Sequence, residues 1–85
     1  MRRDVFQAIA DPTRRAIIQL LSKKSLNLNA VAENFKISRP AVSQHLKALL
    51  DCNLVTVSAS GTHRIYSVNT KGFNKLNLWL DQFWS

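Results

Sequence analysis

The sequence contains very little cysteine, glycine or proline: one, two and two residues, respectively, among 85. A single cysteine, Cys52, cannot form an internal disulfide, which excludes a disulfide-stapled secreted scaffold and favours a reducing, cytoplasmic location. The scarcity of glycine and proline, with no low-complexity tract, argues against an internal flexible linker. One small domain over residues 1–85 is therefore expected.

Long apolar runs and catalytic clusters are also missing. No run approaches the roughly 20 apolar residues that a membrane-spanning helix needs, and residues 1–4 lead into a mixed stretch that does not resemble a signal peptide. The sequence has no Gly-rich phosphate loop. Its five carboxylates and two histidines assemble no nucleophile, base and orienting group at a recognisable spacing. The sequence therefore predicts neither a membrane protein nor an enzyme.

Acidic side chains are scarce, because five Asp and Glu stand against twelve Lys and Arg, for a formal net charge of +7. Residues 1–50 hold nine basic and three acidic side chains, whereas residues 51–85 hold three and two. Such a basic excess on a small chain indicates a polyanionic partner, either nucleic acid or an acidic membrane surface.

Two helices are predicted in the first quarter of the chain. Residues 3–9 carry a short apolar stripe formed by Val5, Phe6 and Ile9. Asp11 is expected to cap a second helix that runs to about Leu21, because its carboxylate can accept a bond from the free N–H groups of the first turn. Pro12 suits the first helical position, where its missing N–H costs nothing.

A helix-turn-helix is predicted over residues 28–52. Asn27 is a suitable cap for a helix over residues 28–35, and Ser38 is a suitable cap for a helix over residues 39–52. Two helices joined by so short a turn are typical of a helix-turn-helix unit.

The hydrophobic period changes after Asn53, which is a plausible left-handed helix stop. Residues 54–59 and 63–68 are rich in β-branched and aromatic side chains and flank Gly61, which predicts a two-stranded hairpin, or wing, over about 54–68.

A last helix is predicted over about 70–84, capped by either Asn69 or Thr70. The expected fold class is therefore mainly α with a two-stranded β-hairpin, in the order of a winged helix-turn-helix.

The outward side of the helix over residues 39–52 is polar and basic, while Val42, Leu46 and Leu49 recur at a spacing that faces the core. Arg can donate two bonds to guanine and Gln can pair with adenine, and Lys and Ser bind phosphate. An ordinary solvated helix face has a similar composition, but the short preceding helix, the tight turn and the hairpin favour DNA reading. Base contacts are expected from Arg39, Pro40, Ala41, Ser43 and Gln44, and phosphate contacts from Lys36, Ser38, His45 and Lys47.

Thr62, His63 and Arg64 lie at or just beyond the tip of the predicted hairpin. An arginine there can enter the minor groove or pair with phosphate, although a solvent-exposed turn is the alternative. Because the basic residues line a polar face and do not flank an apolar anchor, double-stranded DNA is favoured over a membrane surface. RNA is disfavoured, since its major groove is too narrow for helix readout.

Residues 11–15 (DPTRR) and residues 38–47 (SRPAVSQHLK) resemble the ArsR-type winged-helix repressors of bacteria. The similarity extends through residues 64–68 and covers essentially the whole chain. It implies a homodimer that binds a pseudo-palindromic operator and represses transcription, with the first and last helices at the dimer interface.

The last helix carries more apolar side chains than one side of a small domain can bury, which indicates a partner. Together with the first helix it can form a self-complementary twofold patch. The alternative is that all of these side chains belong to the core. The expected interface residues are Val5, Phe6, Ile9, Phe73, Leu76, Trp79, Leu80, Phe83 and Trp84. A twofold dimer would separate its two recognition helices by ~34 Å, one turn of DNA, or a multiple of it.

The chain departs from the resembled family in its possible sensor sites. Residues 28–32 contain no Cys-x-Cys arrangement, and residues 70–85 contain no His and only one Asp. Because soft and borderline metals need clustered ligands, neither a metal site nor a cofactor is expected. A redox- or ligand-responsive regulator that uses Cys52, an unidentified small-molecule effector and a winged-helix protein-interaction module are the open alternatives.

Lys36 is a second departure, because the family often has glycine at this point of the turn. A lysine in a left-handed backbone conformation would cost about 1 kcal/mol. Either the turn differs here, or the lysine is kept for a phosphate contact.

Overall fold

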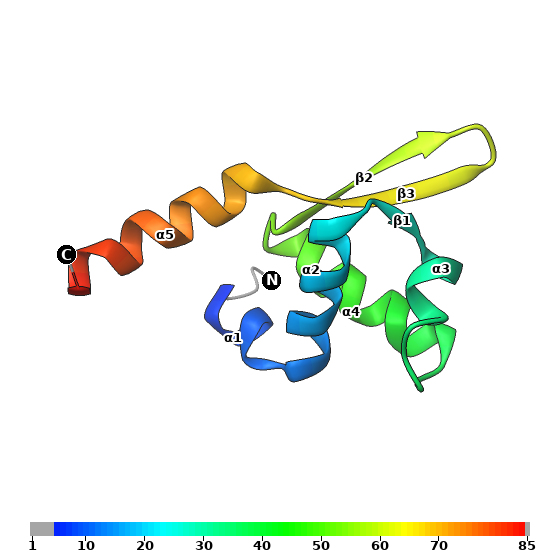
Figure 1. Ribbon diagram of the computed structural model, residues 1–85, viewed down its shortest axis with the longest axis horizontal. Coiled ribbons are helices and arrows are strands. Elements are labelled where there is room, and N and C mark those ends of the chain that lie inside the picture. The colour runs from blue at the N-terminus through cyan, green and yellow to red at the C-terminus, as the bar shows by residue number, and fades with distance from the viewer. Residues whose placement is uncertain (1–4, 85) are drawn as a thin grey trace.

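The computed structural model describes residues 5–84, except for the side chains of five residues of its last helix. Within those residues the elements are α1 (Val5–Ala10), α2 (Pro12–Lys23), β1 (Leu26–Asn27), α3 (Leu28–Ala32), α4 (Arg39–Asp51), β2 (Val55–Ser60), β3 (His63–Val68) and α5 (Thr70–Trp84). Figure 1 shows a helical body, a hairpin that extends from it, and α5 projecting away on the other side.

The three predicted helix caps are confirmed. Asp11, Asn27 and Ser38 precede α2, α3 and α4, and each has extended backbone angles. In each case the side-chain oxygen accepts a hydrogen bond from the backbone N–H three residues later, at 2.9, 2.8 and 3.2 Å in that order. These bonds satisfy N–H groups that have no partner within the helix, and so define where each helix begins.

The helix α3 ends at Ala32, three residues earlier than predicted. The backbone N–H groups of Asn34 and Phe35 bond to carbonyl oxygens three residues back, at 3.1 Å each, so the chain tightens into turns after α3. Phe35 still packs against the core. Lys36 does not adopt a left-handed conformation, because Asn53 is the only non-glycine residue with positive φ in the described part of the chain. The turn before α4 therefore differs from one that needs glycine at this position, which was one of the two alternatives for Lys36.

The sheet has three antiparallel strands in the order β1-β3-β2, not the two that the sequence predicts. The hairpin pairs Val55 with Val68 and continues to the turn, where Gly61 has a φ of +63° as expected. The additional strand, β1, pairs with β3, and Leu26 lies opposite Tyr66. A two-residue strand shows no alternation of polar and apolar residues, so the sequence carried no sign of it.

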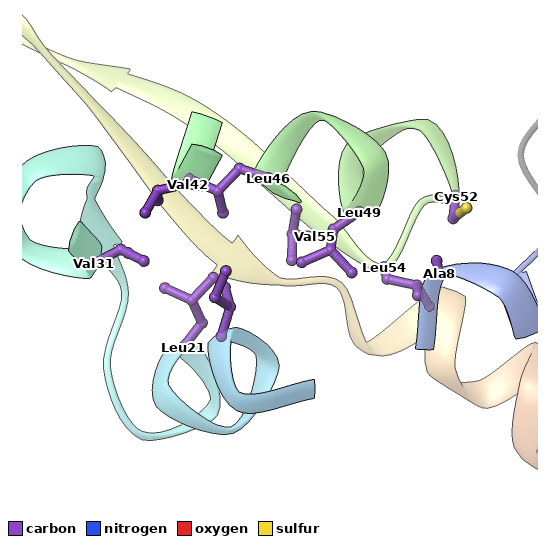
Figure 2. Packing of buried hydrophobic residues seen from close by; sticks show 10 residues of the cluster. Ala8, Leu21, Val31, Val42, Leu46, Leu49, Cys52, Leu54 and Val55 are labelled. Atoms are coloured by element: carbon purple, nitrogen blue, oxygen red, sulfur yellow. The ribbon is translucent and has the colours of Figure 1, made fainter. Parts of the chain in front are cut away.

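The core is formed by apolar side chains from every helix of the body and from the start of the sheet. Val42, Leu46 and Leu49 of α4 are 0–1% exposed, as predicted, and Ile17 of α2 is equally buried. Figure 2 shows side chains of α2, α3, α4 and β2 converging on one another. Burying each of these side chains contributes about 1.5–3 kcal/mol to folding. The packed core therefore fixes the position of α4.

Candidate nucleic-acid interface

The outer face of α4 is exposed and carries most of the residues predicted to read DNA. Arg39, Pro40, Ser43, Gln44 and Lys47 are all exposed, and Ala41 is half-buried. The opposite face is fixed in the core by the four buried apolar residues of this helix, which sets the rotation of α4 about its axis. Among the described residues, no protein group accepts a hydrogen bond from Arg39, Gln44 or Lys47, so their donors are available to a ligand.

A polar groove of about 320 Å³ connects this helix to the wing. It is lined by Asn27, Leu28, Asn29, Ser43, Thr62, His63, Arg64 and Tyr66. The groove therefore brings a predicted base-reading residue, Ser43, together with all three predicted wing residues. It also adds Asn29, an exposed residue of α3 that the sequence interpretation missed. The sequence feature that could have indicated Asn29 is a polar side chain in the first turn of α3, the helix before α4.

The wing residues Thr62, His63 and Arg64 are exposed around the hairpin tip. Lys36 and Ser38 are exposed in the turn before α4, and the hydroxyl oxygen of Ser38 is also the acceptor that caps that helix. Positive charge on this side of the molecule thus comes from the turn, the recognition helix and the wing.

His45 is placed differently from the other predicted phosphate contacts. Its side chain is 22% exposed, and its Nδ1 lies 4.0 Å from Oδ2 of Asp11, the residue that caps α2. The hydrogen bond from the Arg14 backbone N–H lowers the pKa of the Asp11 carboxyl. Partial burial acts in the opposite direction, and the charges of His45 and Arg14 lower this pKa further. His45 of α4 therefore lies close to the residue that caps α2.

Arg14 and Arg15 contribute to the basic excess, and their guanidinium groups are hydrogen-bonded to the backbone of α1. Arg14 donates from its guanidinium to two carbonyl oxygens of α1, at 2.7 and 3.3 Å. Arg15 donates to the next two, at 2.9 and 2.8 Å. Together they occupy the carbonyl groups of residues 7–10, the four that a helix of this length leaves without partners. These two arginines therefore have a structural role at the end of α1.

The predicted dimer residues fall into three groups in the structure. Val5, Ile9 and Phe73 are half-buried and pack against the core, whereas Phe6 is 40% exposed. Leu78, which was not among the predicted interface residues, is 67% exposed on α5. The other predicted side chains lie outside the described part of the structure: Leu76, Trp79, Leu80, Phe83 and Trp84.

Cys52 is 7% exposed and belongs to the core cluster. In the part of the chain that the structure describes, His, Cys, Asp and Glu side chains form no group of three that could hold a metal ion. No helix within the described residues is both long and apolar enough to cross a bilayer.

Comparison with known proteins identifies the family. Residues 11–57, from the cap of α2 into β2, match the profile of the bacterial regulatory proteins of the arsR family. The chain belongs to the ArsR family. The matched segment contains the helix-turn-helix and the exposed face of α4, so the ArsR assignment rests on the same residues as the candidate interface.

Two named relatives of this ArsR-family chain are regulators. The HTH-type transcriptional regulator Rv2034 of Mycobacterium tuberculosis is 44% identical over 80 residues, which cover 94% of this chain and 75% of that protein. The transcriptional repressor SdpR of Bacillus subtilis is 36% identical over 80 residues, which cover 94% of this chain and 89% of that protein.

Solved structures show the same fold. The crystal structure of a possible transcriptional regulator for arsenical resistance superposes with a TM-score of 0.86 at 37% identity, covering 98% of this chain and 86% of that one. The homodimeric winged helix-turn-helix DNA-binding domain of Mb0332 from Mycobacterium bovis gives a TM-score of 0.72 at 23% identity, covering 93% of this chain and 77% of that one. The expected winged helix-turn-helix fold is thereby confirmed, with its third strand added.

Proposed function

We propose that this ArsR-family protein is a homodimeric, non-enzymatic repressor that binds a pseudo-palindromic operator in the bacterial cytoplasm. The observation that carries the proposal is the exposed, polar and basic face of α4, which continues through one groove into the wing. A helix held rigidly at its apolar face and open at its polar face has the dimensions to enter the major groove of DNA.

The residues of this surface divide by chemistry. Arg39 and Gln44 carry the paired donors and acceptors that discriminate base edges, and both are exposed on α4. Lys36 and Lys47 supply point charges suited to phosphate. Arg64 of the wing reaches the adjacent minor groove or its phosphates, and the groove between wing and α4 accommodates the DNA backbone.

Dimerisation completes the operator site. α5 extends away from the body (Figure 1) and exposes Leu78, so a second copy is needed to cover it. The homodimeric state of the Mb0332 domain supports this arrangement. Two chains bring a combined formal charge of +14 to one duplex and place two recognition helices on successive turns.

The redox alternative has less support, because Cys52 is packed in the core and a reactive thiol needs exposure. An unidentified small-molecule effector stays a compatible addition to the repressor function.

The test is selection of preferred sequences from random duplex DNA, followed by titration of variants against the selected site. Wild-type protein should select two half-sites about one helical turn apart, and its affinity should fall steeply with salt because phosphate contacts release counterions. Gln44→Ala should lose roughly tenfold or more in discrimination between bases at one position per half-site.

Lys47→Ala is the comparison variant, because it should weaken binding to all sequences alike. Lys75→Ala on α5 removes the same charge far from α4 in sequence and serves as the charge control. Salt-independent binding, or a Gln44→Ala variant with unchanged sequence preference, contradicts the proposed reading surface.

A further inference from the structure

Hydrogen bonds connect the start of α5 directly to the turn that follows α4. Asn53 follows α4 with a φ of +59°, and its carbonyl oxygen accepts a hydrogen bond from the side-chain amide of Asn69 at 2.8 Å. The backbone N–H of Asn69 donates to the carbonyl oxygen of Leu54 at 2.9 Å. The backbone N–H of Leu54 in turn donates to Leu49, within α4, at 3.0 Å. A continuous chain of hydrogen bonds therefore links the base of α5 to α4.

Gly72 allows this close approach. A methyl group added there would overlap the carbonyl oxygen of Asn53 and lie 3.0 Å from its carbonyl carbon. Gly72 has no positive φ, so the position needs glycine for space and not for backbone conformation. Glycine is among the poorest helix formers, and its place in the first turn of α5 is therefore explained by this contact.

The side chain of Asn69 also bonds to the first turn of α5, so it holds this helix in one orientation relative to Asn53. Its Oδ1 accepts a hydrogen bond from the backbone N–H of Lys71 at 3.2 Å. The same side chain therefore caps α5 and donates a hydrogen bond to Asn53. Phe73 packs against the core immediately after Gly72. We name residues Asn53, Asn69 and Gly72 the α4–α5 joint.

Beyond this joint α5 extends from the body without lying along another element (Figure 1). Its direction is consequently set at its base. A helix of 15 residues is about 22 Å long, so a tilt of about 10° at the base moves the far end by about 4 Å. That displacement is comparable to the ~3.4 Å rise of one base pair.

We propose that the α4–α5 joint is a positioning site that sets the separation of the two recognition helices, and hence the half-site spacing that the dimer accepts. This inference rests on the proposed function, since it assumes DNA contacts on α4 and dimer contacts on α5. Gly72, Asn53 and Asn69 touch no DNA in this proposal, and act only through the geometry of the dimer.

The experiment measures affinity for the selected operator and for versions with one or two base pairs inserted or removed between the half-sites. Gly72→Ala is compared with Lys71→Ala, an exposed neighbour on the same turn. Gly72→Ala should stay folded and dimeric and keep its base preferences within each half-site. It should lose at least tenfold in affinity at the wild-type spacing, or shift its optimum by one base pair or more, whereas Lys71→Ala should match the wild type.

Asn69→Asp decides the question if Gly72→Ala does not fold or dimerise. It keeps the oxygen that caps α5 but replaces the amide that donates to Asn53, and Thr70→Asp adds the same charge one residue later as its control. Asn69→Asp should broaden or shift the spacing preference relative to Thr70→Asp.

Unchanged spacing profiles in the folded, dimeric variants overturn the role of the joint and leave the repressor function intact. A wild-type protein that selects no DNA sequence at all refutes the proposed function instead, so the two failures are distinguishable.

Discussion

Arginines of this chain have different roles according to which backbone groups lie near them. Arg14 and Arg15 each donate to two carbonyl oxygens at the end of α1. Arg39 and Arg64 are exposed on α4 and the wing. The negative end of a short helix attracts a guanidinium as a phosphate does. Residue type alone therefore does not separate arginines with a structural role from those proposed to contact DNA.

Asp11 combines a helix cap with a charge that stabilises the folded state. Because folding lowers the pKa of its carboxyl, the ionised form contributes stability above about pH 4, and this contribution is lost as pH falls through the folded-state pKa. Asp11→Ala should destabilise the protein by about 1 kcal/mol at pH 7 through loss of the cap.

Asp11→Asn separates the two effects, since asparagine caps equally well but does not titrate. The free energy of unfolding is measured in urea at fixed protein concentration. At pH 7 the Asp11→Asn variant should be nearly as stable as the wild type, and it should lose less stability than the wild type between pH 5 and 3. An Asn variant with the acid dependence of the wild type would show that the carboxylate is not the group responsible.

At the scale of elements, helix starts were more predictable than helix ends. Asp11, Asn27 and Ser38 cap their helices as expected because a cap is a local interaction within four residues. The early end of α3 coincides with tight backbone turns that periodicity does not reveal, and the pairing of β1 with β3 depends on groups elsewhere in the chain. Sequence periodicity cannot report such non-local pairing in segments of two to five residues.

The hairpin and the joint use glycine for different physical reasons, and this difference is testable. Gly61 has a φ of +63°, and no atom lies within 4 Å of the place that a Cβ would occupy, so the cost of a side chain there is backbone strain alone. Gly61→Ala should destabilise the protein by about 1–2 kcal/mol.

Gly61→Asn should recover part of that loss, because asparagine tolerates the left-handed region. Thermal or urea unfolding of both variants checks the order glycine, asparagine, alanine. Equal stability of the alanine and glycine forms would show that the turn relaxes to another conformation.

At the scale of the whole molecule, α5 extends from the body and exposes the apolar side chain of Leu78, which a single copy of the chain does not cover. The molecule measures 43 × 28 × 25 Å, and α5 extends along the long direction in Figure 1. If a second copy covers α5, then Leu78→Glu should weaken dimerisation tenfold or more, because a carboxylate would be buried against apolar surface.

Asn77→Glu adds the same charge at an exposed neighbouring position and should leave dimerisation largely unchanged. Sedimentation equilibrium of the two variants and the wild type provides the measurement. A Leu78→Glu protein with wild-type dimer affinity would place the interface elsewhere on the chain.

The sequence by itself determined the order of the main elements, the caps, the glycine at the hairpin tip and the polar face of α4, since these follow from local hydrogen bonding and helical period. It also carried the family motifs. Tertiary structure alone decided that Arg14 and Arg15 close α1, that His45 faces Asp11, and that Gly72 sits against Asn53. These last contacts join residues that periodicity does not relate, and only the folded packing brings them within bonding distance.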